Sequence, residues 1–232
     1  LWGTLGIVYR SDMVKPAPTS WKALIEPDEK HVGHIGMMDE YIDTLAPYLF
    51  LNGESILSGD QQVLRAAYQA LLKQAEAVLT YDYVLSFLQS NAAADQLHMA
   101  LAYGGDETSL NDFAGVDGLW KYAIPKEGTA VWVDCLAILE DATQPELALE
   151  FLAFLDRPEI AAMNAEWNGN GTTNKAAQQL LPEDFKNNPQ IYPSDAVLER
   201  AQNYQRLSKD NILTRERMLR SVIQAHQART AK

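Results

Sequence analysis

One apolar segment, from Thr129 to Leu139, constrains the fold more than any other part of the chain. Its sequence, TAVWVDCLAIL, is rich in β-branched and aromatic residues and predicts a buried strand. Because side chains alternate along a strand, Trp132 and Asp134 are expected on the same face. A carboxylate there needs a cation or hydrogen bonds, since an unpaired buried charge is costly. The pair therefore indicates either a structural Lys or Arg beside Asp134, or a site for an alkyl-ammonium group whose methylenes the ring covers.

The composition excludes some classes of partner. Lys and Arg number 19 and Asp and Glu 31, so the net charge is 19 − 31 = −12. This balance argues against binding of nucleic acid, because phosphates require a basic surface. No apolar run reaches the ~18 residues of a membrane span. The single cysteine, Cys135, lies in the apolar segment and is predicted to be a small buried side chain. The chain opens on Leu1 in strand-like sequence, without Met, which we interpret as a cut.

Strand-like and helical segments alternate over the first ~140 residues, which predicts an α/β lobe. Strands are expected at residues 6–10, 32–38, 97–103, 119–124 and 129–139, and helices at residues 21–25, 41–51, 59–78 and 83–88. Later segments are expected to be helical, at residues 147–155, 160–167, 175–181, 196–207 and 214–228. These later helices need an apolar partner, and we expect the sheet that they cover to lie mostly outside this chain.

No motif of catalysis is found. The sequence has no G-x-S-x-G, no P-loop, no H-E-x-x-H and no C-x-x-C. Of the four histidines, His31, His34, His98 and His226, the first two are three residues apart but flank a predicted strand. We therefore expect an incidental pair and no cluster of metal ligands. The expectation is a protein without enzyme activity, catalytic residues, metal or cofactor.

Several short motifs, in their order and spacing, resemble one family over nearly the whole chain. They are WGTLGI at residues 2–7, TSW at 19–21, PKEG at 125–128 before Trp132-Val133-Asp134, NKAA at 174–177 and IYP at 191–193. These motifs are similar to segments of the periplasmic polyamine-binding proteins, putrescine- and spermidine-binding, of ABC transporters. The resemblance implies the two-lobed α/β clamp of the periplasmic-binding-protein type II fold, with the ligand in the cleft between the lobes.

The resemblance also implies how the chain is divided. Residues 1–120 would form the second α/β lobe, and residues 121–232 the hinge return strand and the helical remainder of the first lobe. The first part of the N-terminal lobe would be lacking. Because missing strands leave open sheet edges, a homodimer through the incomplete lobe is a further expectation.

Six residues match positions at which the family binds its ligand: Trp132, Asp134, Tyr103, Asp106, Asp39 and Asn170. Trp132 corresponds to an aromatic residue on the methylenes of the polyamine, and Asp134 to an acid that meets an ammonium group. Tyr103 and Asp106 match a W-x-G-D motif, with Tyr103 in place of the tryptophan and Asp106 as an acid that meets the other ammonium.

Three of the matches are less direct. Asp39 matches an acid that begins a helix after the second strand, but the second acid expected three residues later is Ile42. Asn170 stands where the family has an aromatic residue. For Asp39 and Asp106 an ordinary acid at a helix N-terminus is the alternative interpretation.

The resemblance implies an extracytoplasmic, periplasmic protein that binds a small cationic amine, putrescine-like before spermidine-like, and delivers it to an ABC permease. Two alternatives stay open. The chain could be the ligand-sensing input domain of a membrane receptor, or the same fold could bind another small ligand such as an amino acid.

Overall fold

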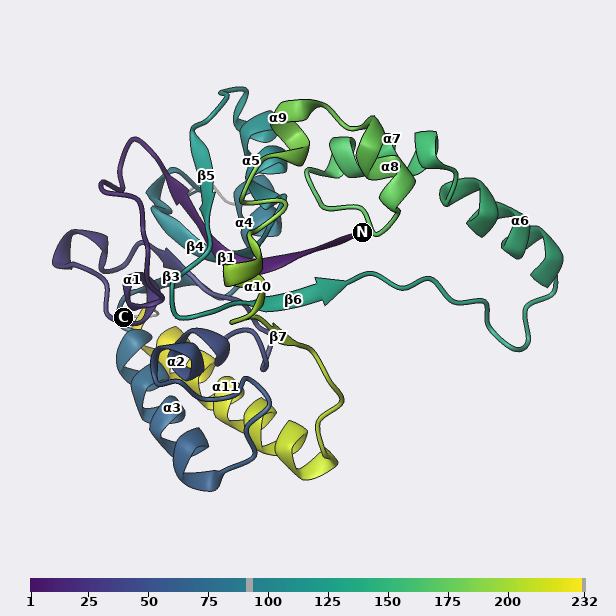
Figure 1. The fold of residues 1–232 in the computed structure, drawn as a ribbon. Helices are drawn as coiled ribbons and strands as arrows, with labels where there is room; N and C mark the ends of the chain where they lie inside the picture. The colour runs from purple at the N-terminus through teal and green to yellow at the C-terminus, as the bar shows by residue number, and fades with distance from the viewer. Residues whose placement is uncertain (91–93, 231–232) are drawn as a thin grey trace.

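The structure, a computed structural model, describes residues 1–90 and 94–230. It confirms the α/β class: the described residues form one sheet with helices around it (Figure 1). The strands are Trp2–Arg10 (β1), Ile35–Gly36 (β2), Val78–Thr80 (β3), Met99–Tyr103 (β4), Trp120–Ala123 (β5), Ala130–Val133 (β6) and Gln202–Asn203 (β7). The helices up to residue 114 are Lys22–Ile25 (α1), Ala46–Leu51 (α2), Gln61–Gln74 (α3), Val84–Ser90 (α4) and Asp106–Ala114 (α5), with 3-10 turns at Glu29–His31 (η1) and Ala94–Gln96 (η2). The later helices are Pro145–Leu155 (α6), Pro158–Asn168 (α7), Lys175–Leu180 (α8), Glu183–Lys186 (α9), Asp195–Leu198 (α10) and Lys209–Thr230 (α11).

Strand β1 is the centre of the sheet. The strand order is β3-β2-β4-β1-β6-β7, and β5 also pairs with β1. From Leu5 onward β1 pairs antiparallel with β4 and β5, whereas its beginning, from Trp2 to Thr4, pairs with β6. Because β1 has neighbours along its length and helices on both faces, its sequence is almost continuously apolar. One strand thus pairs both with β4 and β5 of the first part of the chain and with β6, which begins the second part.

The first part of the chain has two buried clusters that lie on opposite faces of the sheet. Leu5, Ile7 and Tyr9 of β1 lie in the cluster with α1, α2 and α3. Val8 lies in the other cluster, with α4 and α5. This division follows from the alternation of side chains along a strand. The long helix α11 returns to this part, since Leu219 and Val222 lie in the cluster that also contains the buried face of α3.

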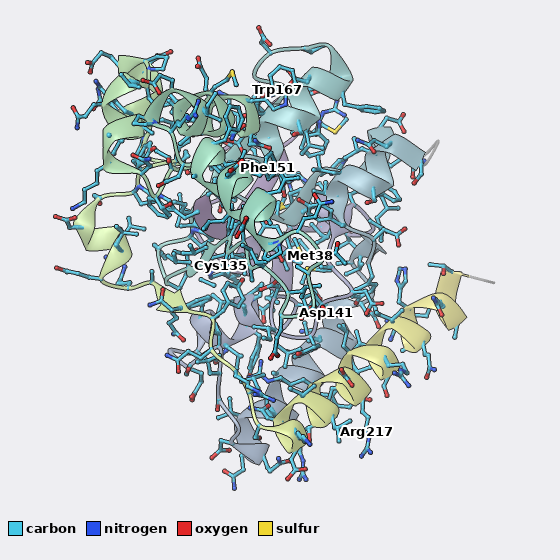
Figure 2. All side chains as sticks on the ribbon, turned by 90° about the vertical axis from the view of Figure 1, so that its right-hand side faces the viewer. Met38, Cys135, Asp141, Phe151, Trp167 and Arg217 are labelled. Carbon is cyan, nitrogen blue, oxygen red and sulfur yellow. The ribbon has the colours of Figure 1, made fainter. Side chains whose placement is uncertain are left out.

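The second part, from β6 through α10, has little core of its own. Its buried cluster consists of Ala162, Ala165, Ala177 and Leu181, and α6 buries none of its residues. Figure 1 shows α6 at the end of a long connection that leads away from the sheet. In Figure 2 this side faces the viewer, with Cys135, Phe151 and Trp167 at the surface. Large apolar side chains are exposed there: Val133, Leu136, Leu139, Leu147, Leu149, Phe151, Phe154, Met163 and Trp167.

The strand predicted over residues 129–139 is correct only as far as Val133. Residues 134–139 form no strand, and most of their side chains are exposed. Cys135 is exposed rather than buried, so that prediction is wrong. The physical reason is pairing: β6 has β1 and β7 as neighbours, and among the described residues no strand continues the sheet past Val133.

Three helix predictions also differ from the structure. The helix that Asp60 caps ends at Gln74, because Val78 begins β3 and pairs with Ile35. The helix predicted over residues 196–207 is only the short α10, since Gln202 then pairs with β6. The helix predicted from residue 41 begins at Ala46. The division at residue 120 stays a prediction. Within the ranges 1–90 and 94–230, no helix combines the length and apolar character that crossing a membrane requires.

Candidate ligand-binding site

A cavity of about 610 Å³ lies where the two parts of the sheet meet, at the end of β4 and beside β6 and β7. Five of the six residues matched by the resemblance line it, from four different elements or turns. The full lining is Asp43, Tyr83, Tyr103, Gly104, Asp106, Val131, Trp132, Val133, Asp134, Asn170, Asn203 and Tyr204. We refer to this cavity below as the pocket.

Asp106 is held in the pocket by the turn between β4 and α5. Gly105 has a φ of +100°, and a Cβ there would lie 2.5 Å from Asn170 Oδ1, so glycine is needed for this turn. The Asp106 carboxylate accepts a hydrogen bond from the Tyr83 hydroxyl at 2.5 Å and one from the Tyr103 backbone N–H at 2.8 Å. Burial raises the pKa of Asp106 to about 6, although both hydrogen bonds act in the opposite direction.

A second buried acid, Asp43, was not among the residues expected from the sequence. Its carboxylate accepts hydrogen bonds from the hydroxyls of Tyr103 and Tyr204, the latter at 2.5 Å. Burial raises the pKa of Asp43 against these two bonds. A signal for it was present: the three-residue spacing counted from Glu40, rather than from Asp39, leads to Asp43. Tyr83 and Tyr204 carried no comparable signal, because their roles depend on the fold.

The structure does not bring Asp39 to the pocket. Asp39 is exposed and lines a separate cavity of about 390 Å³ together with Tyr41 and residues of α11 such as Arg220. The helix after it begins only at Ala46, and the intervening turns direct Asp43 inward and leave Asp39 outside. Ile42, at the position where a second acid was expected, packs against the main core.

Aromatic rings form one wall of the pocket. Trp132 lies on β6 opposite Gly3 of β1, and a Cβ at Gly3 would lie 2.5 Å from its Cζ2 atom. The absence of a side chain at Gly3 therefore lets the indole lie across β1. The Tyr103 ring meets Trp132 edge to face, with centroids 6.3 Å apart, and lies 6.1 Å from the ring of Tyr83.

Asp134 and Asn170 complete the rim. Asp134 is the first residue beyond β6 and lies with Trp132 in the pocket lining, as alternation predicts. It is exposed, and among the described residues no Lys or Arg forms an ion pair with it, so the structural ion pair considered as an alternative is not found. Two buried polar atoms at the pocket have no hydrogen-bond partner in the described part of the chain, the donor Trp132 Nε1 and the acceptor Asn170 Oδ1.

The arrangement suits an organic cation. Three carboxylates, those of Asp43, Asp106 and Asp134, reach the pocket, and its described lining contains neither Lys nor Arg. Ammonium groups donate charge-assisted hydrogen bonds to carboxylates, and aromatic faces attract cations and cover alkyl chains. The residues described here include no group of three or more His, Cys, Asp or Glu arranged to bind a metal ion.

The chain is similar to known proteins in sequence and in fold. The family model described as bacterial extracellular solute-binding protein matches residues 1–193. A norspermidine sensor of Vibrio cholerae is 34% identical over 228 residues, 98% of this chain and 63% of that protein. The putrescine-binding periplasmic protein SpuD of Pseudomonas aeruginosa is 32% identical over 213 residues, 86% of this chain and 57% of that protein.

The fold is shared with solved structures. The spermidine/putrescine ABC transporter substrate-binding protein of Streptococcus pneumoniae superimposes with a TM-score of 0.82 at 24% identity, covering 97% of this chain and 68% of that one. This likeness confirms the expected binding-protein fold. The chain spans only 63% and 57% of the length of the two curated relatives named above.

Proposed function

The chain belongs to the family of bacterial extracellular solute-binding proteins, and from this premise we propose that it captures a small polyamine in the pocket. Its compartment is the periplasm, and its partner is the membrane permease of an ABC transporter, which receives the ligand. The relatives' names denote binding and sensing, so the proposed activity is binding without catalysis.

One observation carries this proposal: three carboxylates from separate segments converge on a cavity with an aromatic wall. Asp106 and Asp134 bind the ammonium groups, and Trp132 and Tyr103 cover the methylenes between them. Each charge-assisted hydrogen bond contributes roughly 1.5–3 kcal/mol to affinity. The unpartnered acceptor Asn170 Oδ1 supplies a further site for an ammonium N–H.

The mechanism is closure of the two parts around the ligand. The pocket takes Tyr103 and Asp106 from one part and Trp132, Asp134 and Asn170 from the other. A ligand that contacts both parts binds the closed arrangement best, so it shifts the population toward closure. The lobe boundary near residue 120 belongs to this proposal, and so does the packing of the apolar side chains of α6 and α7 against the remainder of a lobe.

Sensing is a second candidate, favoured by a specific observation. The norspermidine sensor matches 98% of this chain, whereas SpuD matches 86%. In that case a membrane receptor, rather than a permease, responds to closure. Uptake of a labelled polyamine by cells that lack the gene separates the two. Loss of a transporter component lowers uptake, whereas loss of a sensor leaves uptake unchanged.

Calorimetric titration with putrescine, spermidine, norspermidine, cadaverine and basic amino acids tests the proposal. The protein is used at its full encoded length. Micromolar or tighter binding of one amine is expected, and Asp134→Asn and Asp106→Asn should each weaken it by about 10- to 100-fold. Asp117→Asn, an exposed acid after α5, is the matched control and should bind as the unchanged protein does.

If the folded protein binds no amine, the polyamine proposal is withdrawn. Binding of a basic amino acid alone would favour the alternative of another small ligand in the same fold. The homodimer expected from an open sheet edge stays a prediction, which sedimentation can check.

A further inference from the structure

Three histidines lie together at the N-terminal ends of β2 and β4, away from the pocket. His31 ends η1, His34 precedes β2 and His98 precedes β4. The Nδ1 atoms of His31 and His98 are 3.0 Å apart, and the rings of His34 and His98 stack with centroids 4.0 Å apart and planes at 16°. The spacing of His31 and His34 indicated only an incidental pair, because nothing in the sequence shows that the fold adds His98. We refer to these residues as the histidine cluster.

The contacts in the histidine cluster depend on protonation. A hydrogen bond between two Nδ1 atoms needs a proton on one and a lone pair on the other, so at least one of the two rings must be neutral. When both rings are protonated, two donors and two positive charges face each other. The stacked pair of His34 and His98 has the same constraint, because two imidazolium rings at this separation repel.

The charged groups around the histidine cluster also oppose protonation. Burial lowers the pKa of His98 to about 4, and His34, His31 and Arg10 contribute in the same direction, while Asp12 opposes them. Burial lowers the pKa of His31 as well, with a contribution from Lys30 and an opposing one from Asp28. Asp12 is already paired with Arg10 at 2.7 Å, and the exposed Asp95 also acts on Arg10, so little of their negative charge is left for the imidazoles.

A metal site is a poorer interpretation of the histidine cluster. His34 Nδ1 lies 2.7 Å from the carbonyl oxygen of Gln96, so this nitrogen carries a proton and cannot be a ligand. In the described ranges no set of three potential ligands has a suitable arrangement.

The histidine cluster and the pocket lie at opposite ends of β4. The His98 backbone N–H donates to the His34 carbonyl at 3.0 Å, and β2 and β4 then run parallel from Ile35 and Met99. Strand β4 ends at Tyr103, whose backbone N–H binds Asp106, and the segment after β2 carries Asp43. Five residues of strand span about 16 Å, so β4, with the short β2 beside its start, connects the two places.

We propose that the histidine cluster is a proton-sensitive contact between β2 and β4, and that its protonation in acid loosens these strands and weakens ligand binding in the pocket. The effect on stability stands on the contacts of the histidine cluster alone, whereas the effect on ligand binding rests on the function proposed above. Proton-sensitive elements of this kind couple a local charge change to a distant readout.

The direction of the effect follows from proton linkage. The pKa of His98 is lowered from 6.5 to about 4, so the unfolded chain binds more protons than the native one between these values. The contribution to stability is present above pH 6.5 and is lost as the pH falls toward 4. For one histidine this loss corresponds to about 3–5 °C in melting temperature per unit of pKa difference.

Melting curves between pH 7.5 and 4.5, without ligand, test the first half of the proposal. His98→Gln keeps hydrogen-bonding groups but cannot be protonated, so its melting temperature should fall less steeply with acidification than that of the unchanged protein. His226→Gln, a buried histidine in the same part of the molecule but outside the histidine cluster, is the matched control and should follow the unchanged protein. Superimposable profiles for His98→Gln and the unchanged protein would overturn the proposal.

A second measurement does not depend on the folding of a variant. The imidazole proton resonance of His98 in the unchanged protein, followed by NMR, should titrate with a midpoint below pH 5. A midpoint near 6.5 would overturn the proposal, because the histidine cluster would then tolerate the charge.

The second half is tested by titrating spermidine at pH 7 and pH 4. The acids in the pocket change the affinity equally in His98→Gln and in the unchanged protein. Only the difference in affinity loss between these two proteins therefore reports on the histidine cluster. Because a group with a pKa of about 4 is half protonated at pH 4, we expect His98→Gln to lose up to about twofold less affinity between the two pH values than the unchanged protein. An equal loss, with different melting profiles, would overturn the coupling to the pocket. Absence of binding by the folded protein at pH 7 would instead overturn the proposed function and leave the stability result standing.

Discussion

The two parts of the molecule differ in how far they bury their own apolar side chains. Around β1 and β4, side chains from both faces of the sheet are buried under α1 to α5 and α11. From β6 to α10 the buried cluster consists of a few small residues, and Trp167 is 85% exposed. The two parts have similarly apolar sequences. The difference in burial therefore comes from the helices and strands available to cover the apolar side chains and not from the sequence pattern. The pocket lies at this boundary, with one rigid wall and one wall that has less support.

The largest difference between the two parts is expected when a leucine in each is truncated. Leu64→Ala on α3, where the side chain is 1% exposed, is expected to lower the free energy of unfolding by about 2–5 kcal/mol. Leu149→Ala on α6, where the side chain is 61% exposed, should change it by less than about 0.5 kcal/mol. Urea unfolding of the 232-residue chain measures both. Equal costs would show that α6 is covered in solution.

A change at the boundary should affect ligand affinity. Gly3→Ala places a methyl group where the Trp132 ring lies, so the indole must move out of the aromatic wall. We expect affinity for the amine to fall about tenfold, because stacking of this kind contributes up to about 1.5 kcal/mol. Gly59→Ala is the control, since its nearest neighbour would lie at 3.4 Å. Unchanged affinity in Gly3→Ala would argue against a role for Trp132.

Asp106, on the better-supported wall of the pocket, should make ligand binding depend on pH. Asp106 has a pKa raised from 3.8 to about 6 in the free protein, and an ammonium ligand binds its ionised form. Affinity should therefore be constant above pH 7 and fall by about tenfold per pH unit below 6. Calorimetry in buffers with different ionisation enthalpies should also show proton release on binding near pH 6. Asp106→Asn should remove most of the loss of affinity and most of the proton release.

The smallest effect is expected on the exposed side of α6. Phe151→Ser should leave the free energy of unfolding of the 232-residue chain within about 0.5 kcal/mol and reduce its binding of an apolar dye such as ANS. Phe151 is 58% exposed, so the substitution removes apolar surface without opening a cavity. A large loss of stability would mean that this face packs against a second chain or segment under the conditions used.

The sequence predicted best where local patterns and tertiary partners agree. The strand that becomes β4 and the start of the helix that Asp60 caps are confirmed, because their burial is provided within the chain. The segment after Val133 has the same apolar character but no neighbouring strand in the described residues, so its pattern predicted a strand that does not form. The later helices were expected to lack the sheet that they cover, and the exposure of α6 is consistent with that expectation.

For the site, the resemblance supplied the residues that lie on predicted strands or immediately beyond them, and missed those set by loop geometry. Trp132 and Tyr103 were identified because their strands carry recognisable motifs. Asp43 was missed by one residue, because the count began at Asp39 and not at Glu40. Tyr204 lies 161 positions from Asp43, and no local pattern connects two such distant residues.

Tyr103 acts as a spacer between two charges. Its backbone N–H binds Asp106 and its hydroxyl binds Asp43, so a single residue fixes the separation of two anionic centres before any ligand arrives. The separation is then a property of one side chain and not of how far the molecule closes. For an amine held between Asp106 and Asp134, as proposed above, Tyr103 therefore fixes one of the two anchor points. The chain length that fits then depends on where closure brings Asp134.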